Sequence, residues 1–157
     1  MRFLRILPLF VTCFVVATLL SRCGQNFPSA PEGSFQKVYE ILKKSNCNEC
    51  HVQTAATWKE DKVFLDFAAA KTAYKTLTST TVMGPSSKNI CKGVKNVTAS
   101  NVEKSYMAAV LDDKIPQENF GGVKGCTPYT THHTNTNLSD AQKSSIKKWI
   151  SNGAKDD

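Results

Sequence analysis

Residues 34–51 read SFQKVYEILKKSNCNECH, and this stretch decides how the chain begins to fold. Ser34 is a good helix N-cap residue, and apolar side chains follow it at helical spacing. They are Phe35, Val38, Tyr39, Ile41 and Leu42. The predicted helix leads directly into Cys47-Asn48-Glu49-Cys50-His51, in which two thiols stand three residues apart. Because positions i and i+3 of a helix lie on one face, both thiols and the adjacent imidazole are predicted to meet around one bound group.

The pattern Cys-x-x-Cys-His is the attachment sequence for haem c. We expect one covalently bound haem, with a thioether from each of Cys47 and Cys50 and with His51 as the proximal iron ligand. Other uses of a cysteine pair fit this chain less well. A zinc site needs a second pair of ligands, a thioredoxin-like pair follows a strand in a βαβ unit, and a disulfide between Cys47 and Cys50 would be strained.

Three further segments are predicted to be helical. Residues 61–77 carry apolar side chains at helical spacing. Capping boxes at residues 100–103 and 139–142 are typical of helix starts, and the last helix is predicted to stop at Gly153.

Loops separate these helices. Residues 78–98 and 112–137 lack periodicity and contain several glycines and prolines. No segment shows a convincing period of two, so the predicted fold class is all-α, with about four helices and long loops. A chain of 157 residues with 41% hydrophobic and 21% charged residues is typical of one globular domain rather than a disordered or repeat protein.

The N-terminus predicts export. Arg2 and Arg5 precede an apolar stretch at residues 6–20, which a polar Ser21-Arg22 follows. This is the pattern of a secretory signal, and the stretch is shorter than the ~20 residues that span a bilayer. The stretch Leu20-Ser21-Arg22-Cys23-Gly24 resembles a bacterial lipoprotein box, in which the cysteine becomes the lipid-bearing first residue.

Cleavage nearer Ala30 is the alternative to lipidation at Cys23. The protein is therefore expected in the periplasm, either free or anchored to the membrane by a lipid and facing the periplasm. The predicted organisation is a signal peptide at residues 1–22, a flexible tether at 23–33 and one domain at 34–157.

The positive charge does not indicate nucleic-acid binding. The full chain carries +7, but loss of residues 1–22 removes three arginines and leaves +4 over 135 residues. A surplus of this size is typical of a solvated surface. A docking face for an acidic redox partner, or simply a solvated surface, is predicted at Lys88, Lys92, Lys95 and Lys104.

Once the signal, the lipid acceptor and the haem motif are assigned, Cys91 and Cys126 remain. Disulfides persist outside the cytoplasm, so these two cysteines are predicted to pair. A bond that closes their 34 intervening residues would stabilise the fold by ~3–4 kcal/mol. Two buried thiols are the alternative.

Together these motifs resemble a class I cytochrome c. In that family an N-terminal helix leads into CxxCH, and a C-terminal helix packs across the first. The likeness is closest to a bacterial single-haem subgroup with two further cysteines and a characteristic last helix. The matching parts here are Cys91, Ser105-Tyr106-Met107, Cys126, Leu138-Ser139-Asp140-Ala141-Gln142, Trp149-Ile150 and Gly153-Ala154. The resemblance covers about residues 34–154 and implies a class I cytochrome c-like fold around one haem.

The resemblance also implies a methionine on the far side of the iron, after the second cysteine, but this chain has none there. The same segment contains His132 and His133, and one of them is the predicted distal ligand. Met83, in a predicted loop, is the alternative. Met107 falls inside a predicted helix, where methionine more often fills the core, and an open sixth position is a further alternative.

The predicted function is electron transfer between exported redox partner proteins, without enzymatic activity and without nucleic acid. The alternative is a haem-based gas or ligand sensor, or a peroxidatic haem protein, which needs an open sixth position. Tyr74, Tyr106 and Trp149 are interpreted as haem-pocket and helix-packing residues rather than catalytic ones.

Overall fold

The computed structural model describes residues 29–55, 65–82, 91–128 and 138–157. Within these ranges the protein is helical and contains no β-strand, which confirms the all-α fold class for the part described. An isolated bridge pairs Thr81 with Lys95. The elements in chain order are α2 (Phe35–Lys44), α3 (Cys47–Cys50), α5 (Ala70–Ser79), α6 (Tyr106–Leu111), the 3-10 helix η2 (Phe120–Gly122) and α7 (Asp140–Ser151).

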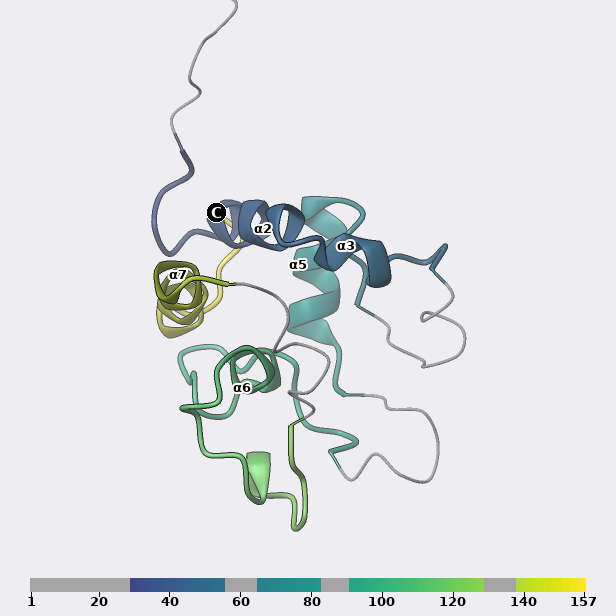
Figure 1. The fold of residues 1–157 in the computed structure, drawn as a ribbon, viewed down its shortest axis with the longest axis vertical. Helices are drawn as coiled ribbons and strands as arrows, with labels where there is room; N and C mark the ends of the chain where they lie inside the picture. The colour runs from purple at the N-terminus through teal and green to yellow at the C-terminus, as the bar shows by residue number, and fades with distance from the viewer. Residues whose placement is uncertain (1–28, 56–64, 83–90, 129–137) are drawn as a thin grey trace, which may run out of the picture.

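The first and last of these helices, α2 and α7, pack against each other. Figure 1 views α7 along its axis while α2 lies across the page, so the two helices cross steeply. At the crossing, the ring of Phe35 lies 5.2 Å from that of Trp149 and 5.1 Å from that of Tyr74 on α5. Burial of each large side chain is worth about 1.5–3 kcal/mol, so this aromatic cluster fixes three helices together.

Both terminal helices begin where the sequence predicts. Ser34 Oγ accepts a hydrogen bond from the Lys37 backbone N–H at 3.2 Å. The predicted capping box of α7 is present: Ser139 Oγ accepts from the Gln142 N–H at 3.3 Å, and Gln142 Oε1 accepts from the Ser139 N–H at 2.8 Å. Gly153, with φ of 95°, follows the end of α7 as predicted.

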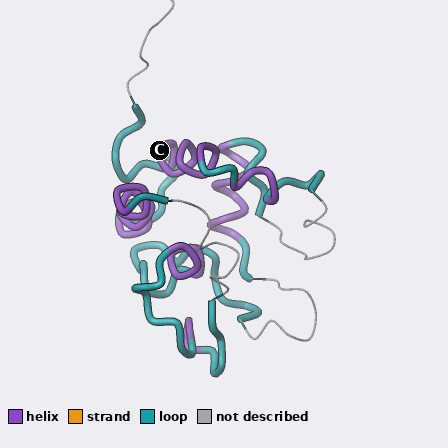
Figure 2. The backbone as a smooth tube through the Cα atoms, in the orientation of Figure 1, coloured by secondary structure: helices purple, strands orange, loops and turns teal. Residues whose placement is uncertain are grey.

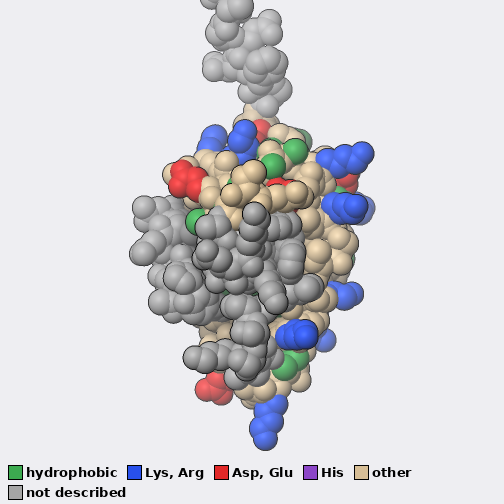
Figure 3. Space-filling model, turned by 90° about the vertical axis from the view of Figure 1, so that its right-hand side faces the viewer, with side chains coloured by type: hydrophobic (Ala, Val, Ile, Leu, Met, Phe, Trp, Pro, Cys, Tyr) green, Lys and Arg blue, Asp and Glu red, His purple; other side chains and the backbone are tan. Residues whose placement is uncertain are grey.

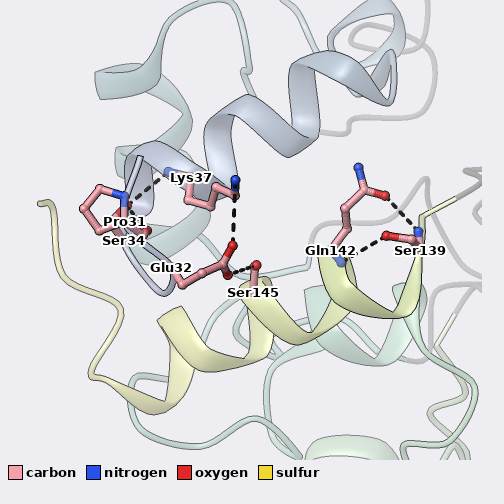
Figure 4. Close-up of polar contacts among 7 residues, drawn as sticks. All are labelled: Pro31, Glu32, Ser34, Lys37, Ser139, Gln142 and Ser145. Atoms are coloured by element: carbon pink, nitrogen blue, oxygen red, sulfur yellow. Dashed lines mark hydrogen bonds and ion pairs between the residues drawn. The ribbon is translucent and has the colours of Figure 1, made fainter. Parts of the chain in front are cut away.

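The end of the predicted tether is packed onto the domain. The Glu32 carboxylate accepts a hydrogen bond from the Ser145 hydroxyl of α7 and lies 3.7 Å from Lys37 Nζ of α2 (Figure 4). Gly33 is buried with φ of 83°, and a Cβ there would come within 3.0 Å of Lys148. The chain therefore enters the domain in a fixed turn over both terminal helices.

The helix predicted over residues 61–77 begins later than expected. Residues 61–64 lie outside the described part, 65–69 are not helical, and α5 starts at Ala70. The cause is competition for backbone groups. Asp66 Oδ1 accepts a hydrogen bond from the Ala68 N–H, and the Phe67 N–H donates to the His51 carbonyl, so neither donor takes part in a helix.

The capping box predicted at residues 100–103 is wrong. Ser100 has φ of 60° and donates its N–H to Ile150 O at 2.8 Å. Asn101 Oδ1 instead accepts from the Lys104 N–H, and the N-cap residue of α6 is Ser105. The turn that precedes α6 is thus held both by a contact with α7 and by the local hydrogen bond between Asn101 and Lys104.

Around α6 the chain is mostly loop, drawn in teal in Figure 2. There the structure joins Cys91 to Cys126 in a disulfide, with the two Cα atoms 4.7 Å apart and both residues buried. This bond ties the segment before α6 to the segment after η2. None of the helices in the described ranges has both the length and the apolarity needed to cross a membrane.

Candidate functional site

The candidate site is built on α3, a single helical turn that directly follows α2. Ser45 ends α2, its N–H donating to Ile41 O at 3.0 Å. Asn46 then adopts the left-handed conformation, with φ of 58°, which asparagine tolerates better than most residues. This residue redirects the chain so that Cys47 begins a new turn. Cys47 and Cys50 therefore lie one turn apart on α3, as the sequence predicts.

The two cysteines of α3 lie in different surroundings. Cys47 is half-buried against the core, whereas Cys50 is exposed. Burial, with a smaller contribution from nearby Cys50, raises the pKa of the Cys47 thiol to about 11. This raised pKa is the opposite of what dithiol oxidoreductases use, because their attacking thiols have lowered pKa values.

His51 stands at the C-terminal end of this turn, where its N–H donates to Cys47 O at 3.0 Å. Its imidazole lies against the ring of Phe67, with the ring centroids 5.0 Å apart. Phe67 also donates its N–H to the His51 carbonyl at 2.7 Å. Phe67 falls within residues 61–77, which are predicted to be helical, and no local signal in the sequence links it to a residue sixteen positions earlier.

The structure does not describe the predicted ligands for the far side of the iron. His132, His133 and Met83 lie outside the described residues, as do Cys23 and the predicted signal peptide. Met107 is 6% exposed within the hydrophobic core on α6, as expected for a core-filling methionine.

The three aromatic residues interpreted as packing residues all make such contacts. Tyr74 donates its hydroxyl to Ala154 O at 3.1 Å, and the buried Trp149 donates Nε1–H to Lys155 O at 2.9 Å. Tyr106 meets Phe120 edge-on, with the centroids 6.1 Å apart. These three side chains hold helices and loops together; whether they line a haem pocket stays a prediction.

On the face that Figure 3 shows, the blue lysine side chains lie at several separate places, most of them near its edges. Of the four lysines named as a docking face, Lys92, Lys95 and Lys104 are exposed, and Lys88 lies outside the described residues. Exposure agrees with both interpretations, a docking face and a solvated surface.

The donor set of the α3 turn fits a covalently bound haem. Haem c needs two thiols three residues apart and an imidazole directly after the second, and Cys47 and Cys50 of α3 with the C-cap residue His51 provide this combination. In the described ranges no group of three His, Cys, Asp or Glu side chains is placed to hold a metal ion.

A comparison of the chain with protein-family models, with curated proteins and with solved structures gives no match.

Proposed function

We propose that this chain is an exported electron-transfer protein that carries one haem c on α3. The observation that carries the proposal is the α3 turn itself, with Cys47 and Cys50 one turn apart and His51 at its end. When bound there, haem supplies the one-electron chemistry of its iron.

Each residue of the turn has a separate proposed role in holding the haem. Cys47 and Cys50 anchor the group through thioethers, so it stays in place whatever the oxidation state. His51 offers its imidazole to the iron, and its backbone is held by hydrogen bonds to Cys47 and Phe67. In this role the chain holds the group and its own side chains carry out no bond chemistry.

We further propose a class I cytochrome c-like architecture. The family resemblance implies that the last helix packs across the first, and α7 crosses α2 in this way (Figure 1). The cross-link between Cys91 and Cys126 also joins the two cysteines that the subgroup places around its middle helix. These features support the proposal, which extends over the described part of residues 34–154.

The sixth ligand distinguishes electron transfer from gas sensing or peroxidatic chemistry. We propose His132 or His133, since the ligand segment contains no methionine but two adjacent histidines. A saturated iron reacts slowly with carbon monoxide, whereas a vacant position binds it at once. We therefore expect the reduced wild type to bind carbon monoxide slowly, and His132→Ala/His133→Ala to keep its haem but bind it rapidly.

Met83→Leu is the matched control, and it should leave carbon monoxide binding unchanged. A ~695 nm absorption band in the ferric wild type, typical of thioether ligation, would assign the ligand to methionine instead. Rapid, stoichiometric carbon monoxide binding by the wild type would favour the sensor or peroxidatic function over electron transfer.

A further inference from the structure

A short non-helical segment lies between α3 and α5 and is tied to two helices. We call residues 65–69 the bracing segment. The Asp66 N–H donates to Thr76 Oγ1 on α5 at 3.1 Å, and Asp66 Oδ1 accepts from the Ala68 N–H at 3.0 Å. The Tyr39 hydroxyl on α2 donates to Ala68 O at 3.2 Å. Because these bonds fix the segment to both α2 and α5, its backbone is a rigid support.

Phe67 is the middle residue of this support, and it touches His51 twice. Its N–H donates to the His51 carbonyl at 2.7 Å, which fixes the backbone of the histidine. Its ring lies against the imidazole at 5.0 Å between centroids, with the two planes tilted by 42°. Phe67 is itself only 4% exposed, so the ring has little freedom to move away.

We propose that Phe67 is a positioning residue that sets the rotation of the His51 imidazole about its Cβ–Cγ bond. The inference rests on the proposed function, since the orientation matters when the imidazole binds haem iron. Ligand histidines are commonly oriented by a neighbouring group, and that group tunes the metal as well as the ligand. Here Phe67 acts on His51 in two ways: its ring contacts one side of the imidazole, and its N–H donates a hydrogen bond to the His51 backbone.

The orientation of the imidazole plane has a direct spectroscopic consequence. The orientation of the plane determines how the imidazole orbitals overlap with the iron d orbitals. This overlap in turn affects the g values of the ferric state and the reduction potential. A side chain without a flat ring at position 67 would let the imidazole sample a wider range of angles.

Phe67→Leu tests this role. Leucine keeps the apolar character and the backbone N–H that donates to His51, but it removes the flat ring. Phe35→Leu is the matched control, because Phe35 is 2% exposed and packs on Trp149 at the far end of α2 from α3. Both variants are purified as exported holoprotein, and their covalent haem content, urea stability, ferric EPR spectrum and reduction potential are compared with the wild type.

We expect both variants to keep covalent haem and to lose stability to a similar extent. Only Phe67→Leu should shift or broaden the largest g value and change the potential. Wild-type g values in Phe67→Leu, or an equal shift in Phe35→Leu, would overturn the positioning role and leave the proposed function intact. A wild type without covalent haem would overturn the proposed function, and this inference with it.

Discussion

Asp112 is a buried carboxylate at the C-cap of α6, and it joins that helix to α7. Its side chain forms an ion pair with Lys147 Nζ and accepts the Lys114 N–H at 3.1 Å. Burial alone would raise the pKa of this carboxyl, but the hydrogen bond from Lys147, that from Lys114 and the charges of Lys147 and Lys143 together hold the pKa below its ordinary value. The charged form is therefore part of the folded state.

Asp112→Asn should destabilise the protein at pH 7 by about 1–3 kcal/mol, because it removes a charged hydrogen bond from a buried site. Since the pKa is lowered on folding, this stabilisation is present above the unfolded pKa of ~3.9 and lost as the pH falls through the folded pKa. Urea titrations at pH 7 and across pH 2–4 would measure both effects.

The neighbouring Asp113 is exposed, so Asp113→Asn is the matched control and should change the unfolding free energy little. If Asp112→Asn lowered the unfolding free energy by the same amount at every pH, the ionised carboxylate would not be the source of the lost stability.

At the scale of the elements, α2 begins with an unusual set of caps. The Lys37 N–H is taken by Ser34, but the N–H groups of Phe35 and Gln36 donate to Asp157, to its side chain at 2.9 Å and to its carbonyl at 3.4 Å. A residue 122 positions away thus satisfies donors that a helix start leaves open, and it places a negative charge at the positive end of the helix dipole.

Asp157→Ala should therefore cost about 0.5–1 kcal/mol of unfolding free energy, as the loss of other helix caps does. Asp156 is also exposed and serves as the control, since Asp156→Ala leaves the cap in place. Chemical denaturation of the two variants side by side is the measurement, and equal stabilities would show that Asp157 does not cap α2 in solution.

Elements could be predicted from the sequence where their boundaries depend on nearby residues. The capping box of Ser139 and Gln142 was correct because both of its hydrogen bonds close within four residues. The box at residues 100–103 failed because the Ser100 N–H is taken by Ile150. In the same way, the start of α5 depends on a hydrogen bond from the Phe67 N–H to the His51 carbonyl. Helical periodicity does not predict this bond.

The same distinction holds for the candidate site. Cys47 and Cys50 share the single turn of α3 and His51 caps its end, so their spacing alone predicted that the three residues lie together. Phe67 reaches His51 only through the packing of α2, α5 and the bracing segment, and a single sequence does not contain that information. The distal ligand is a prediction from the family resemblance and lies outside the described residues.

For the molecule as a whole, the Cys91–Cys126 disulfide connects the loop-rich half around α6. Both residues are nearly inaccessible to solvent, at 2% and 0% exposure. Reduction should lower the unfolding free energy by ~3–4 kcal/mol, because the unfolded chain regains the freedom of a closed loop. Mass spectrometry of non-reduced peptides should find the two cysteines linked; two alkylated thiols in the purified protein would refute the pairing.

The central claim, a covalent haem on α3, is tested most directly by extracting the denatured, purified protein with acidified acetone. Haem held by two thioethers resists this treatment, so we expect it to remain with the polypeptide of the wild type. Cys47→Ser and Cys50→Ser should each retain one thioether, and the double variant should have none. Recovery of all wild-type haem in the acetone, or a purified protein with no haem at all, would contradict the account.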